Sequence, residues 1–141
     1  MYYLKRHFTF AGGHRLSKHM GRCFSLHGHN YDVWVTLRAP KLDENDMVMD
    51  FSKFKEIVNV FIDEFDHCLL INETDAEMIE PLKEKGMRVM VIGAFDPTAE
   101  KMAEQLFLGI NVVLKAQFKN IEVDQVEVFE NVKSSAIYRE D

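Results

Sequence analysis

Three histidines near the N-terminus have the spacing of metal ligands. His27 and His29 flank Gly28 at the start of a predicted strand, where residues two apart point to the same side. His14 follows an earlier predicted strand, and antiparallel pairing of the two strands would bring it beside the other two histidines. Three imidazole nitrogens with a fourth position open are typical of catalytic zinc, whereas structural zinc normally has four protein ligands. The sequence therefore predicts a Zn²⁺ site; the alternative is three polar loop histidines that bind no metal.

Cys23 lies four residues before His27 and is the side chain best suited to move a proton at such a site. Three roles are open: a fourth zinc ligand, a base whose thiolate is favoured by the metal and by Arg15 or Arg22, or an inert buried cysteine. We favour the base, because a fourth protein ligand would close the site to substrate. Cys68 stands in an apolar run and is expected in the core.

Three further side chains are candidates for proton transfer and ligand binding. Asp66 and His67 pair a carboxylate with the side chain that titrates near neutral pH, as a proton relay requires. Adjacent side chains are not expected to bond each other, and a simple polar pair at a helix end is the alternative. Glu130 lies on the same strand face as Val128, where a carboxylate can accept two parallel hydrogen bonds from a flat ligand edge. A solvated glutamate is the alternative there.

Composition narrows the classes of function. The 141 residues include 17 basic and 23 acidic side chains, a net charge of −6. A general nucleic-acid binder needs a basic surface, so no nucleic-acid partner is expected. The chain lacks an apolar run of membrane-spanning length and an export signal, which predicts a cytoplasmic protein with no membrane contact and no structural disulfide. Basic residues gather near the N-terminus, where they form either a phosphate pocket or a solvated face: Lys5, Arg6, Arg15, Lys18 and Arg22.

The hydrophobic pattern predicts the elements that position these residues. Strands are expected where β-favouring residues occur, at 2–10, 30–38, 125–131 and 135–138. Gly12-Gly13 are expected to end the first strand, which leaves His14 just past it. One helix of three to four turns should start at residue 51 with Asp50 or Ser52 as its cap, and a second long helix should follow Asp96-Pro97-Thr98.

The acidic segment 72–96 is the least regular part of the pattern. We expect a short helix from about Ala76 that Pro81 interrupts, and a short extra strand at 87–92. Without this segment, the order is strand, strand, helix, helix, strand, strand. That order predicts one α+β domain spanning 1–141, with a four-stranded antiparallel sheet and two helices on one face. The two open sheet edges favour association into a closed barrel.

Five segments together resemble the 6-pyruvoyltetrahydropterin synthase family: F-T-F-A-G-G-H-R-L, C-F-S-L-H-G-H-N-Y, F-D-H-C-L-L-I-N, D-P-T-A-E and E-N-V-K-S-S-A-I-Y-R. The resemblance spans nearly the whole chain, and H-G-H with its upstream cysteine and earlier histidine is its most specific part. It implies a T-fold (tunnelling fold) of ββααββ order, with subunits joined into barrels as a trimer or a hexamer of two trimers.

The resemblance also implies a role for each candidate residue. It implies Zn²⁺ bound by His14, His27 and His29 and proton transfer by Cys23. A relay of Asp66 and His67 would be completed across a subunit interface. The pterin ring would be anchored by Glu130, in a pocket lined or supported by Thr98 and Glu100.

Within the family, the Cys-x-x-x-His-x-His spacing is similar to the bacterial 6-carboxytetrahydropterin synthases of queuosine synthesis. That branch implies a zinc-dependent lyase that converts 7,8-dihydroneopterin triphosphate to 6-carboxy-5,6,7,8-tetrahydropterin, with loss of acetaldehyde and triphosphate. Candidate triphosphate partners are Arg15, Lys18, Arg22 and Arg139. Alternatives are a pyruvoyl synthase that eliminates only triphosphate, a plain zinc hydrolase, and a non-catalytic zinc-containing pterin-binding module. Two departures from the family pattern are Gly12-Gly13 and the long segment 72–96.

Overall fold

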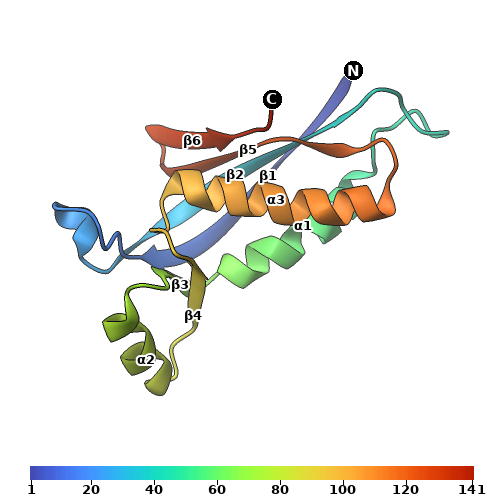
Figure 1. Ribbon diagram of the computed structural model, residues 1–141. Coiled ribbons are helices and arrows are strands. Elements are labelled where there is room, and N and C mark those ends of the chain that lie inside the picture. Colours follow the sequence, from blue (N-terminus) through green and yellow to red (C-terminus); the bar gives the residue numbers. More distant parts are fainter.

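A long antiparallel hairpin of β1 (Tyr2–His14) and β2 (His27–Ala39) forms the centre of the computed structural model, which describes residues 1–141 (Figure 1). The two strands pair along their whole length, from Tyr2 opposite Ala39 to His14 opposite His27. β1 therefore continues through Gly12-Gly13, and the expectation that it ends there is wrong. Every second side chain toward the His14 end of β1 is buried, so one face of the hairpin belongs to the core.

The hairpin is part of a six-stranded mixed sheet with the order β4-β3-β1-β2-β5-β6. β5 (Glu122–Asn131) and β6 (Ser134–Tyr138) continue it in antiparallel fashion beside β2. β3 (Cys68–Asn72) lies parallel to β1, and β4 (Val89–Gly93) lies parallel to β3. The predicted α+β class is confirmed, but the four-stranded, fully antiparallel sheet is wrong. Parallel pairing joins segments that are distant in sequence, so no local turn signal marks it.

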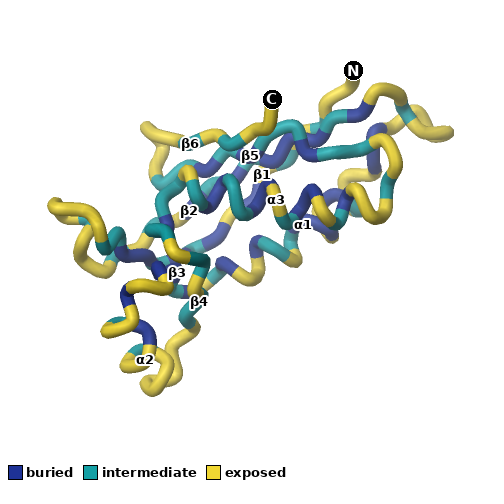
Figure 2. The backbone as a smooth tube through the Cα atoms, viewed as in Figure 1, coloured by how far each residue is buried: buried dark blue, intermediate teal, exposed yellow.

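Two long helices cover one face of the sheet, α1 (Phe51–Phe65) and α3 (Ala99–Gln117) (Figure 1). Asp50 caps α1 by accepting the Ser52 N–H at 2.7 Å, and Thr98 caps α3 by accepting the Lys101 N–H at 3.3 Å. Both helices start where the sequence predicts. Their apolar faces join the sheet in a core of 24 buried residues. Figure 2 marks buried residues along both helices and the central strands. Burial of each large apolar side chain contributes about 1.5–3 kcal/mol.

Segment 72–96 projects from the sheet and its two covering helices, and it rejoins the sheet at its second half. It contains the third helix, α2 (Ala76–Glu84), and the predicted extra strand, β4. Pro81 lies inside α2, so the expectation that it interrupts this helix is wrong. The order of elements is therefore ββαβαβαββ, with a 3₁₀ turn at Arg22–Phe24, in place of the predicted ββααββ. No helix of the chain combines the length and the apolar character needed to cross a bilayer.

Candidate functional site

The three candidate metal ligands end the buried face of the β1–β2 hairpin. His14 lies opposite His27, and Gly12 lies opposite His29, so all three imidazoles point to the face that packs on the helices. One ligand atom from each histidine lies within 4.8 Å of those of the other two. His14 is 1 % exposed and is the last residue of β1 rather than a loop residue past its end.

Backbone carbonyls orient two of the three rings. The Nδ1–H of His14 donates to the Pro97 carbonyl at 2.8 Å, and that of His27 donates to the Ser25 carbonyl at 2.7 Å. Each Nε2 is then left with its lone pair, which is the state that binds a metal. These two Nε2 atoms are only 2.9 Å apart, and the buried Nε2 of His29 has no hydrogen-bond partner. Three converging nitrogen acceptors without donors fit a bound Zn²⁺ ion.

Burial favours the neutral form of the first of these ligands. Desolvation lowers the pKa of His14, the hydrogen bond to Pro97 partly opposes this, and the neighbouring His27 lowers the pKa further. The ring is therefore neutral at neutral pH, as a metal ligand must be.

Gly28 allows the two strands to approach at the histidines. A Cβ at this position would lie 2.9 Å from the carbonyl oxygen of Gly12 on β1. This neighbour is backbone and cannot rotate away as a side chain can. The small residue between the two ligands thus permits the strand spacing that brings His14 to them.

The three predicted substrate-binding residues lie together, beside the histidines. Glu130, Thr98 and Glu100 line one pocket of about 300 Å³ between the end of β5 and the start of α3. Glu130 follows the buried Val126 and Val128 on the same face of β5, and its Oε1 is 4.0 Å from the Nε2 of His14. Its carboxylate is thus within reach of both the pocket and the histidine cluster.

Cys23 lies in the 3₁₀ turn between the two central strands and is partly exposed. Its carbonyl accepts the Leu16 N–H at 2.9 Å, which closes the loop that contains it. The sulfur is not part of the group of converging ligand atoms, and it makes no hydrogen bond. Cys23 is thus close to the histidines in sequence, but its sulfur does not join their nitrogen atoms as a fourth candidate ligand atom.

Asp66 and His67 form a short connection between α1 and β3. Asp66 accepts the Ala11 N–H at 2.9 Å and lies 3.0 Å from the Nδ1 of His67. The expectation that these adjacent side chains do not bond each other is wrong: His67 has a positive φ of 53°, and the two side chains contact each other. The Ala11 N–H, and then His67, hold the pKa of Asp66 below its ordinary value.

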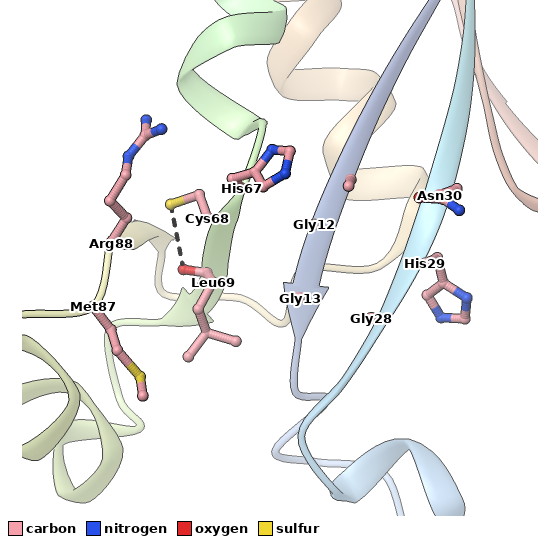
Figure 3. Close-up of a pocket in the computed structure, with 11 residues that line it drawn as sticks. Gly12, Gly13, Gly28, His29, Asn30, His67, Cys68, Leu69, Met87 and Arg88 are labelled. Atoms are coloured by element: carbon pink, nitrogen blue, oxygen red, sulfur yellow. Dashed lines mark hydrogen bonds between the residues drawn. The ribbon is translucent and has the colours of Figure 1, made fainter. Parts of the chain in front are cut away.

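The ring of His67 is 78 % exposed and lines a larger pocket of about 620 Å³. Figure 3 shows His67 and His29 on opposite sides of β1, with the side-chain-free positions Gly12 and Gly13 between them. Cys68 is buried near this pocket, and burial raises the pKa of its thiol. The Asp66–His67 pair and the histidine cluster are thus neighbours across one strand, without a direct contact between them.

The family model for 6-pyruvoyl tetrahydropterin synthase matches residues 3–141. The chain belongs to the 6-pyruvoyl tetrahydropterin synthase family. A protein of Rickettsia conorii named 6-carboxy-5,6,7,8-tetrahydropterin synthase is 35 % identical over 102 residues, which cover 72 % of this chain and 74 % of that protein. A protein of the same name from Aquifex aeolicus is 31 % identical over 144 residues, with coverage of 97 % and 89 %.

Solved structures agree with this family in fold. An uncharacterized protein of Wolinella succinogenes matches with a TM-score of 0.82 at 24 % identity, covering 99 % of this chain and 98 % of that one. The 6-pyruvoyl tetrahydropterin synthase of Caenorhabditis elegans matches with a TM-score of 0.70 at 24 % identity, covering 99 % and 96 %. Six strands and three helices are thus arranged here in the fold of the 6-pyruvoyl tetrahydropterin synthase family.

Two residues beside the site of this family member were not singled out from its sequence. Tyr31 is fully buried, its ring centroid is 5.4 Å from that of His29, and its hydroxyl has no hydrogen-bond partner. Its position two residues after His29 on the buried face was an available signal. Pro97 contributes through its carbonyl, and a backbone contact of this kind leaves no trace in residue types.

One predicted phosphate partner is already paired inside the protein. Arg15 is buried, and its guanidinium lies 3.4 Å from Asp75 and 3.8 Å from Glu77. The other candidates are exposed: Lys18, Arg22 and Arg139. Arg15 therefore faces carboxylates rather than open solvent.

Proposed function

We propose that this chain is a zinc-dependent lyase that converts 7,8-dihydroneopterin triphosphate to 6-carboxy-5,6,7,8-tetrahydropterin, with loss of acetaldehyde and triphosphate. This reaction belongs to 7-deazaguanine synthesis, the queuosine pathway. The observation that carries the proposal is the three-histidine cluster, whose buried member His14 lies 4.0 Å from the Glu130 carboxylate, in a chain of this family. Relatives that cover most of the chain have the name of this activity.

The pocket beside the cluster suits a pterin ring. The Glu130 carboxylate can accept two parallel hydrogen bonds from the ring N–H and the exocyclic amino group. Thr98 and Glu100 line the same pocket at the start of α3.

His14, His27 and His29 would hold a Zn²⁺ ion, which would supply Lewis acidity to the side-chain hydroxyls of the substrate. Cys23 then removes or returns the proton on the substrate carbon, and its loop position leaves the sulfur free of other bonds. Asp66 orients His67 through their 3.0 Å contact, and His67 exchanges the second proton. The relay is completed across a subunit interface, which is consistent with the 78 % exposure of the His67 ring in the single chain.

The chain is further proposed to act as one domain in the cytoplasm and as a homo-oligomer, a trimer or hexamer, without a nucleic-acid partner. Two unpaired sheet edges, β4 and β6, and the acidic net charge of −6 support these statements.

Product analysis by mass spectrometry tests the function. Protein with one zinc ion per chain should convert 7,8-dihydroneopterin triphosphate to 6-carboxytetrahydropterin and release acetaldehyde. His14→Ala should lower zinc content and reduce turnover about 10³-fold or more. His7→Ala is the matched control, because His7 pairs with Asp32 at 2.6 Å and is not in the cluster. A pyruvoyl product would identify the other branch. If neither product formed, the proposal would be contradicted.

A further inference from the structure

The loop that contains Cys23 has little packing of its own. Residues 15–26, here named the Cys23 loop, are mostly exposed (Figure 2), and the 3₁₀ turn within it has no buried residue. Its internal hydrogen bonds include Leu16 N–H to the Cys23 carbonyl and Ser25 N–H to the Arg22 carbonyl. These bonds give the loop its shape, but they do not fix it on the protein.

Carboxylates of segment 72–96 fix the loop in place. One hydrogen bond joins the loop to its immediate neighbour in sequence, from His27 Nδ1–H to the Ser25 carbonyl. Every other hydrogen bond or ion pair from the loop to the rest of the chain ends on one of three carboxylates: Asp75, Glu77 and Asp96. Asp96 accepts the Ser17 hydroxyl at 2.6 Å and the Lys18 N–H at 2.9 Å. Segment 72–96 therefore holds the Cys23 loop through these contacts.

A second anchor lies at the start of α2. The buried guanidinium of Arg15 lies 3.4 Å from the Asp75 carboxylate, and its carbon is 4.3 Å from the ring centroid of Phe24. Phe24 is the residue after Cys23. Asp75 thus acts on the turn through a flat, fully charged group that stacks on an aromatic ring.

The position of Asp96 connects the loop to the metal ligands. The next residue, Pro97, accepts the Nδ1–H of His14 at 2.8 Å, so two consecutive residues hold the Cys23 loop and a zinc ligand. Burial raises the pKa of Asp96, but hydrogen bonds from Ser17, Lys18 and Asn72 outweigh it and hold the pKa below its ordinary value. The carboxylate is therefore ionised and accepts strong hydrogen bonds.

We propose that Asp96, supported by the Asp75–Arg15 pair, is a positioning residue that holds the Cys23 loop at a fixed place relative to the three-histidine site. The inference rests on the proposed function, in which Cys23 transfers a proton. Segment 72–96 then has a specific role, because it sets the placement of the proton-transfer residue without contacting substrate.

Asp96→Asn tests the inference in the zinc-loaded protein. An amide offers one acceptor where the carboxylate offers two, so Ser17 or Lys18 loses its partner. Hydrogen exchange of the Leu16 and Ser25 amides should become about tenfold faster. The kcat should fall about tenfold, while the KM for the pterin triphosphate changes less than about twofold and zinc content stays the same. A purely structural role would not separate kcat from KM.

Asp43→Asn is the matched control. Asp43 also accepts two backbone N–H groups, from Asn45 at 2.8 Å and from Met47 at 3.0 Å. It follows the C-terminal end of β2, whereas His27 lies at the N-terminal end of that strand. This variant should keep the wild-type kcat and loop exchange. Ser17→Ala is a milder second variant that keeps the carboxylate, and it should lower kcat about threefold in the same manner if Asp96→Asn does not fold.

Wild-type loop exchange in both variants would overturn the inference, and so would faster loop exchange with an unchanged kcat. Absence of pterin turnover in the wild-type protein would instead contradict the proposed function. The exchange rates of Leu16 and Ser25 would then still decide whether Asp96 anchors the loop, because that measurement needs no substrate.

Discussion

At the scale of single residues, position on the sheet determines the chemistry of the site. His14, His27, His29 and Glu130 have the same alternation as the core residues of their strands, so they extend the buried face into a polar end. The sequence allowed the three histidines to be grouped, because alternation and antiparallel pairing are local rules. It did not reveal the Asp66–His67 contact, because that contact accompanies the positive φ of His67.

The depressed pKa of Asp66 predicts a pH-dependent contribution to stability. An acid whose pKa is lower in the folded state than its ordinary value of 3.8 stabilises the fold fully above that value. This contribution is lost as the pH falls through the folded pKa. The Asp66 side chain is 39 % exposed, so solvent screens its interactions and keeps their contribution small. Asp66→Asn should therefore lower the free energy of unfolding by about 1 kcal/mol at pH 5.

Urea unfolding of both proteins between pH 6 and pH 2 measures this difference, which should shrink toward the acid end. Asp63→Asn is the control, since the Asp63 carboxylate on α1 makes no hydrogen bond or ion pair, and it should show no such trend. A pH-independent difference for Asp66→Asn would mean that the carboxylate charge does not stabilise the fold.

At the scale of elements, local signals were predictive and distant pairings were not. The helices α1 and α3 follow from apolar spacing and from the caps Asp50 and Thr98, all within one or two turns. Cys68 was expected in the core, but β3 was not recognised as a strand, because its partners β1 and β4 are parallel and lie far along the chain. The anchoring of the Cys23 loop by segment 72–96 was hidden for the same reason.

The close approach of β1 and β2 at Gly28 predicts a sharp effect of one methyl group. In Gly28→Ala, the new Cβ would lie 2.9 Å from the Gly12 carbonyl oxygen, so the strands must separate where they position His27 and His29. The free energy of unfolding should fall by about 1–3 kcal/mol, and zinc affinity should fall with it. Urea unfolding and zinc titration against a competing chelator measure the two effects.

Gly13→Ala provides the comparison on the neighbouring strand. Its Cβ would lie 3.2 Å from the Cδ1 of Leu69, the mobile end of a side chain, and 3.5 Å from the nearest backbone atom. The loss of stability should stay below about 1 kcal/mol, with zinc affinity retained. Equal effects of the two substitutions would show that the strand approach at Gly28 is not the determining feature.

At the scale of the whole molecule, the single chain leaves its functional groups separated. The ring of His67 has no contact with the histidine cluster or with Cys23, and the sheet ends in two unpaired strands, β4 and β6. Association through sheet edges removes such edges and brings side chains of neighbouring copies together. The composition predicted neither the number of subunits nor the contact geometry, because both depend on surface shape.

Subunit mixing tests whether the site is shared between copies. Cys23→Ala and His67→Ala should each be inactive when every subunit has the same substitution. In oligomers reassembled from equal amounts of both, a site that takes Cys23 from one chain and His67 from the next is intact in about one case in four, so about a quarter of wild-type activity should return. If one chain supplied both residues, every site would have a defect and no activity would return. Light scattering of each preparation must first show that the variants assemble like the wild-type protein, since a failure of assembly would abolish turnover for a different reason.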